Sequence, residues 1–117
     1  MVGGGSLLLT TVGCRSGQPR TVIVAYLRDG DDLIVHDVPL AKSGLPPWAL
    51  NLHAHPEAEV RLGRERYRAR AESVEGEERA GHWGHLVAAD PILDKFQRLS
   101  GRQIAVIQLR KIGGSSG

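Results

Sequence analysis

Short apolar or alternating runs, separated by tight polar turns, limit what this chain can fold into more than any other feature. Runs that are rich in β-branched residues, or that alternate between apolar and charged residues, are typical of strands. The turn signal Asp29–Asp32 and the turn Gly63–Arg66 each join two such runs, which predicts two hairpins. The runs expected as strands are Ser6–Val12, Thr21–Arg28, Leu33–His36, Ala58–Leu62, Tyr67–Val74 and Gln103–Arg110.

Helices are expected at three places in the remaining sequence. Pro47 is placed to open the first of them, and Pro91 separates the last two. The expected helices are Trp48–His55, Gly76–Ala89 and Ile92–Leu99. This order predicts a mainly β (α+β) fold, in which an antiparallel sheet closes into a small barrel with helices packed outside. We expect one domain over residues 7–112, with flexible ends at 1–6 and 113–117.

The loop between the first two strands, Gly13–Arg20, holds the densest group of candidate binding residues. Its glycines, including Gly17, let backbone N–H groups approach a ligand closely. Arg15 and Arg20 offer guanidinium groups that match phosphate oxygens, and Ser16 adds a hydroxyl. From these residues alone two interpretations stay open, which are a phosphate site and an ordinary polar hairpin with solvated arginines.

Composition argues against several other classes of protein. The net charge of +2 and an aromatic content of 4% do not favour nucleic-acid binding. Cys14 is the single cysteine, so no internal disulfide can form and a cytoplasmic setting is expected. No segment is long and apolar enough to span a membrane. His53 with His55, and His82 with His85, lack convergent further ligands, so no metal site is expected.

Several motifs, taken in order, resemble the deazaflavin-dependent nitroreductase family over about Leu7 to Ile112. The matching segments are Leu7–Thr21, Tyr26–Gly30, Pro47–Leu52, Ala54–Val60, Glu77–Arg79 and Arg102–Val106. The resemblance implies a split β-barrel of the kind that also binds flavin mononucleotide. It implies as well that reduced coenzyme F-420, a deazaflavin, passes a hydride to a quinone, a nitroaromatic or another unsaturated small molecule.

The resemblance also assigns roles to individual residues. It implies that Arg15, Ser16, Gly17 and Arg20 hold the phosphate and the acidic tail of the coenzyme. The residues implied on the side of the deazaflavin ring are Val22, Ile23, Val38 and Trp48. Lys42 could reach the acidic tail of the coenzyme or be a solvated loop lysine. The chain departs from the family here, with Val22-Ile23 where some members have Asn-Pro and with Pro39 and Leu40 in a segment of usually small residues.

Other expectations concern catalysis and partners. His36 ends the third expected strand and is a candidate proton donor. The alternatives left open are an oxidoreductase barrel that binds flavin mononucleotide (FMN), and a coenzyme carrier or ligand-binding barrel without catalysis. Family members have an N-terminal helix before the first strand, so this chain would be shortened, minimal, or completed by forming a homodimer. The alternating arginines between Arg61 and Arg70 would allow a weak peripheral contact with an acidic membrane.

Overall fold

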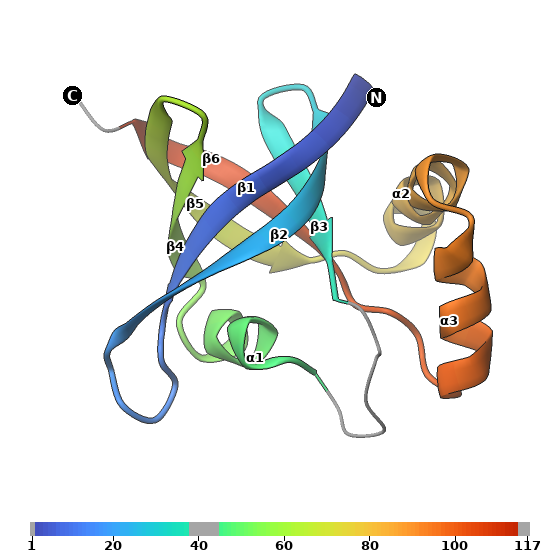
Figure 1. The fold of residues 1–117 in the computed structure, drawn as a ribbon, viewed down its shortest axis with the longest axis horizontal. Helices are drawn as coiled ribbons and strands as arrows, with labels where there is room; N and C mark the ends of the chain where they lie inside the picture. Colours follow the sequence, from blue (N-terminus) through green and yellow to red (C-terminus); the bar gives the residue numbers. More distant parts are fainter. Residues whose placement is uncertain (1, 38–44, 115–117) are drawn as a thin grey trace.

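Six antiparallel strands close into a barrel in the computed structural model, which describes residues 2–37 and 45–114 (Figure 1). Their order around the barrel is β1-β2-β3-β6-β5-β4. The strands are β1 (Val2–Val12), β2 (Pro19–Asp29), β3 (Asp32–His36), β4 (Glu57–Leu62), β5 (Glu65–Ser73) and β6 (Val106–Gly114). The helices are α1 (Pro47–Ala54), α2 (Gly76–Ala89) and α3 (Ile92–Ser100). The barrel and the three flanking helices confirm the fold expected from the sequence.

Strand β1 begins at Val2, so the expectation of a flexible terminus is corrected for residues 2–6. These residues pair with the far end of β2, from Arg28 to Ala25, with an irregularity in register between Val2 and Gly4. The backbones approach very closely there, because a Cβ on Gly4 would lie 2.0 Å from the carbonyl oxygen of Tyr26. The glycine-rich start is therefore part of the sheet, and glycine is what permits the contact.

Strand β6 is also displaced from its expected position. It starts at Val106 instead of Gln103 and continues to Gly114, where Gly113 and Gly114 pair with Arg68 and Tyr67 of β5. Residues 113 and 114, expected as part of a flexible tail, are thus strand residues, and 115–117 lie outside the described residues. Two of the three residues before Val106 bond other parts of the fold instead, Ile104 with Arg79 and Gln97 and Ala105 with Asp37.

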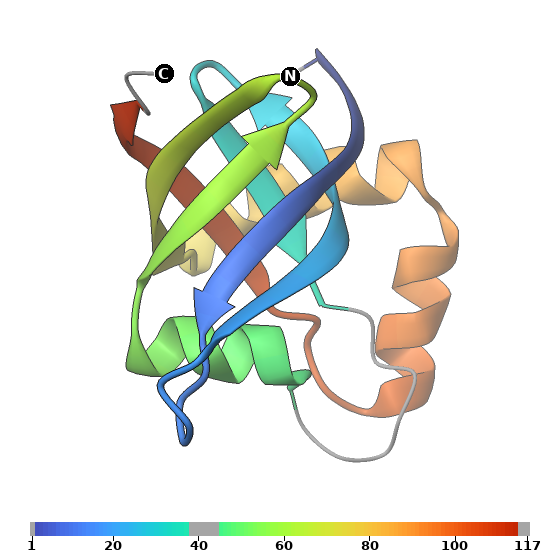
Figure 2. The ribbon, with the colours of Figure 1, turned by 60° about the vertical axis from the view of Figure 1, so that its left-hand side comes forward.

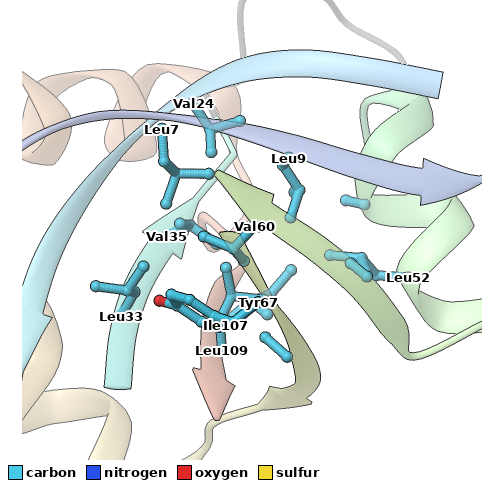
Figure 3. Packing of buried hydrophobic residues seen from close by; sticks show 13 residues of the cluster. Leu7, Leu9, Val24, Leu33, Val35, Leu52, Val60, Tyr67, Ile107 and Leu109 are labelled. Carbon is cyan, nitrogen blue, oxygen red and sulfur yellow. The ribbon is translucent and has the colours of Figure 1, made fainter. Parts of the chain in front are cut away.

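The interior of the barrel is filled by the inward-facing side chains of all six strands (Figure 3). Leu9, Leu33 and Leu109 are fully buried, and each such side chain contributes about 1.5–3 kcal/mol through removal from water. Tyr67 lies among them, and burial, followed by the negative charge of Glu65, raises the pKa of its phenol. A second cluster joins Ile34 and Val106, on the outer face of the barrel, to Leu86 of α2 and Leu93 of α3.

Helix α1 lies across the end of the barrel from which the β1–β2 loop emerges, whereas α2 and α3 lie along one side (Figures 1 and 2). Pro46 precedes α1 in an extended conformation, Pro47 occupies its first turn, and Pro56 follows its C-cap at His55. Proline is favourable in a first turn, where its missing N–H has no intrahelical partner to lose. The sequence therefore sets both ends of the helix that faces the loop.

A buried carboxylate fixes the end of β3. Asp37 Oδ2 accepts a hydrogen bond from Nη2 of Arg102 at 2.7 Å, and Oδ1 accepts one from the N–H of Ala105 at 2.7 Å. The Asp37 side chain is fully buried, whereas that of Arg102 is 28% exposed. The backbone N–H of Asp37 also donates to the carbonyl of Ala105. These contacts attach the last described residue before position 38 to the segment that leads into β6.

Candidate active site

The loop between β1 and β2 has a defined shape that its own residues maintain. The N–H of Gly13 donates to the carbonyl of Gln18 at 2.8 Å, and the N–H of Gly17 donates to the carbonyl of Gly13 at 2.9 Å. Gly17 has a φ of 71°, a left-handed conformation that favours glycine. The N–H of Gln18 donates to Oγ of Ser16 at 3.1 Å. The loop is therefore a compact turn.

Donors of this loop are left available to a ligand. Within the described part of the chain, no hydrogen bond is found for the backbone N–H groups of Arg15 and Ser16. The Ser16 oxygen accepts from Gln18, so its O–H can still donate. The side chains of Arg15 and Arg20 are exposed and add guanidinium donors. Consecutive backbone N–H groups beside arginines form a concave site that suits a phosphate or carboxylate.

A hollow of about 500 Å³ lies between this loop and α1. Arg15, Ser16 and Arg20 line one side of it, and Trp48 and Asn51 line the other. Trp48 is half-buried and packs against the barrel core, so its ring forms a fixed wall. The hollow thus combines cationic donors with an aromatic surface, which suits an anion that carries an apolar group.

A second hollow, of about 300 Å³, lies where the outer face of β2 and β3 meets α2 and α3. Its walls are mainly apolar and include Ala25, Leu27, Leu86 and Leu93. Gly4 and Gly5 also line it, together with His36. An apolar space with few polar groups suits a planar, uncharged ring.

His36 has a defined tautomer in this second hollow. Its Nδ1 lies 2.7 Å from the carbonyl oxygen of Asp37. A carbonyl can only accept a hydrogen bond, so Nδ1 carries the proton. Neutral His36 therefore offers Nε2 as an acceptor, and it can give a proton from Nε2 only as an imidazolium. This geometry restricts the form in which His36 can act as the expected proton donor.

The structure brings some of the predicted residues together and separates others. Arg15, Ser16, Arg20, Val22 and Trp48 line the first hollow, and Gly17 shapes its loop. Ile23 points to the opposite face of β2 from Val22, as strand alternation requires, and is 72% exposed. Val38 and Lys42 lie outside the described residues.

Sequence reasoning missed two residues beside the first hollow. Asn51 of α1 accepts a hydrogen bond from the N–H of Cys14 and donates one to Thr11, and both Asn51 and Thr11 are buried. The signal that could have found Asn51 is an amide on the otherwise apolar face of a short helix. Thr11 is one of two consecutive threonines in β1, and nothing in the sequence distinguishes it from Thr10.

His53 and His55 lie at the end of α1, and His82 and His85 lie on α2. Among the described residues, no group of three or more His, Cys, Asp or Glu side chains is arranged to hold an ion. His82 instead faces Gln108 and Asp29, at 3.4 Å and 3.9 Å from its Nε2. The described helices include none with the length and apolar character needed to cross a bilayer.

Comparison with known proteins adds a second line of evidence. The family model for F420H(2)-dependent quinone reductase matches residues 1–111. An F420H(2)-dependent quinone reductase of Mycobacterium tuberculosis is 37% identical over 70 residues, which cover 60% of this chain and 47% of that protein. The chain thus spans about half the length of the curated relatives that it matches in this way.

Solved structures with the same architecture include an F420-H2 dependent reductase. It superposes with a TM-score of 0.78 at 27% identity, and the superposed region covers 90% of this chain and 93% of that reductase chain. A structure described as a domain-swapped dimer superposes with a TM-score of 0.80 at 27% identity, over 90% of this chain and 79% of its own. With a family match along nearly the whole sequence and a shared barrel, the chain belongs to the F420H(2)-dependent quinone reductase family.

Proposed function

We propose that the protein binds reduced coenzyme F-420 and reduces a quinone-type small molecule. The observation that carries the proposal is that strand β2 contributes to both hollows. Arg20, Thr21 and Val22 line the first hollow, which we call the cationic hollow. Ala25, Tyr26 and Leu27 line the second, which we call the apolar hollow. An elongated ligand with an anion at one end and a planar ring at the other, bound in the first hollow, would point its ring along this strand toward the second hollow.

The dimensions along β2 support this arrangement. Thr21 and Ala25 are four positions apart, which corresponds to roughly 13 Å along an extended strand. Loop donors would hold the phosphate end, and Trp48 would flank the molecule as it leaves the loop. The acceptor ring would occupy the apolar hollow beside Leu86 and Leu93, whose side chains would shield one side of it from water.

Few catalytic side chains are needed for this reaction. When bound, the coenzyme supplies a hydride, and a quinone takes up that hydride and one proton to become a hydroquinone. The chain binds and orients the two molecules, which is the main contribution of a protein to such a transfer. His36 would supply the proton in its imidazolium form, and solvent is the alternative source.

Titration of the purified protein tests the proposal directly. Quenching of the fluorescence of Trp48 and Trp83 by F-420, followed by oxidation of reduced F-420 in the presence of menadione, is the expected result. Menadione and a nitroaromatic compound, compared in the same assay, would define the acceptor class. Binding of FMN alone would support the flavin alternative, and binding of F-420 without turnover would support a coenzyme carrier. No binding of either molecule would contradict the proposal.

Two further proposals concern partners. A homodimer is supported by the superposition on a domain-swapped dimer and by the exposed Ile23, and light scattering tests it.

Weak contact with an acidic membrane is supported by the arginines of β4 and β5. Arg66 and Arg68, however, pair with Glu59 and Glu57 on the same hairpin, which reduces its net positive charge. Sedimentation with vesicles that contain an anionic lipid, compared with neutral vesicles, measures this contact.

A further inference from the structure

The side-chain amide of Asn51 connects helix α1 to both the strand and the loop of the cationic hollow. Its Oδ1 accepts a hydrogen bond from the N–H of Cys14 at 3.0 Å, and its Nδ2 donates to Oγ1 of Thr11 at 3.0 Å. Asn51 is 5% exposed and Thr11 is 1% exposed. A buried amide that is satisfied on both sides holds its partners in place, because an unpaired polar group would lose its hydration without compensation.

The hydrogen bond from the N–H of Cys14 to Asn51 fixes the position of the loop relative to α1. The bonds among Gly13, Ser16, Gly17 and Gln18 shape the loop but join it only to itself. Among the hydrogen bonds of residues 13–18 in the described structure, the one from Cys14 attaches the loop to a helix. Cys14 also immediately precedes the two available N–H groups, so its position sets theirs.

We propose that Asn51 is a positioning residue for coenzyme binding and that Thr11 fixes the orientation of Asn51. The inference rests on the proposed function, because it assigns the loop to the anionic end of F-420. A loop that is already held in place loses less conformational freedom when a ligand binds, which increases affinity. The effect is confined to the anionic end, because Asn51 and Thr11 do not line the apolar hollow.

Two substitutions of Thr11 provide a matched test, since this residue does not line either hollow. Thr11→Val keeps the shape of the side chain but removes the oxygen that Asn51 bonds, whereas Thr11→Ser keeps the oxygen. Dissociation constants are measured for F-420 and for the corresponding deazaflavin that lacks the phosphate and the acidic tail. We expect Thr11→Val to weaken F-420 binding roughly tenfold, with unchanged affinity for the phosphate-free compound, and Thr11→Ser to bind both like the wild type.

General damage to the fold would give a different pattern. Equal losses for both compounds in Thr11→Val, or wild-type affinity for F-420, would overturn the inference. Asn51→Ala supplies a second variant with the same expected pattern, and Leu50→Ala, at an exposed neighbouring position of α1, is its control. Wild-type protein that binds no F-420 would contradict the proposed function itself. Wild-type protein that binds F-420, with variants that bind it equally well, would contradict only the role of Asn51.

Discussion

Replacing Asp37 with asparagine should destabilise the protein by about 3 kcal/mol, because it removes the charge from a carboxylate with two short hydrogen bonds. Both oxygens of Asp37 accept at 2.7 Å, one from Arg102 and one from the N–H of Ala105. The asparagine amide can accept only one of these bonds, and its NH₂ group then faces the other donor. Partial exposure of Arg102 keeps the loss below that of a fully buried pair.

The expected change in melting temperature follows from chain length. An unfolding entropy of about 2.1 cal/mol/K per residue gives roughly 0.25 kcal/mol/K for 117 residues. A loss of about 3 kcal/mol therefore lowers the midpoint by about 12 °C, measured by circular dichroism or calorimetry. Asp31→Asn, at an exposed turn position, is the matched control and should stay within about 2 °C of the wild type. A midpoint for Asp37→Asn equal to that of this control would refute the reasoning.

Other substitutions separate binding, turnover and stability. Arg20→Gln should weaken F-420 binding about 10- to 100-fold and reduce the salt dependence of that binding. Arg64→Gln, on the distant β4–β5 turn, is the control and should change neither. Equal losses of affinity in the two variants would contradict the assignment of the β1–β2 loop to the anionic end of F-420. His36→Ala should lower turnover of menadione at least about tenfold with F-420 affinity unchanged. Turnover equal to that of the wild type would show that solvent, and not His36, supplies the proton. Ala89→Trp should fill the apolar hollow and raise KM for the acceptor without changing the affinity for F-420; an unchanged KM would place the acceptor elsewhere. The raised pKa of Tyr67 means that its stabilising contribution is present below about pH 10 and is lost as pH rises through the folded-state pKa. Urea unfolding at pH 8 and pH 11 should therefore show a smaller alkaline loss for Tyr67→Phe than for the wild type, and identical losses would contradict this.

Local sequence patterns were sufficient to predict most of the fold. The predicted bounds of α2 agree with the structure, because an acidic first turn and a following Asp-Pro mark its ends. The start of β1 was not predictable in this way, because Gly3–Gly5 reads as a flexible segment until the close approach to Tyr26 is known. The start of β6 was missed because Ile104 and Ala105 are apolar like a strand but make contacts outside it. Ile104 accepts a hydrogen bond from Arg79, and Ala105 bonds Asp37.

The candidate site was predictable where its chemistry is carried by side chains within one loop. Arg15, Ser16 and Arg20 could be identified from adjacent residues, because an anion site needs donors and glycine-allowed turns. Asn51 could not be, since its role depends on a contact with Cys14 across 37 positions of sequence. The opposite orientations of Val22 and Ile23 follow from strand alternation, but which of them faces α1 depends on the register of β2 against β1.

The barrel is closed by a short seam. Strand β1 pairs with β2 from Val2 to Val12 but with β4 only through Leu8, Leu9 and Thr10. Among the described strand pairs, β1–β4 has the fewest paired residues, so local opening there would move the β1–β2 hairpin away from β4 and carry the β1–β2 loop with it. A ligand that bridges the loop and α1 would oppose this motion, so binding and barrel closure are linked equilibria. We therefore expect hydrogen exchange at Leu8–Thr10 to slow when a ligand fills the hollow between the β1–β2 loop and α1.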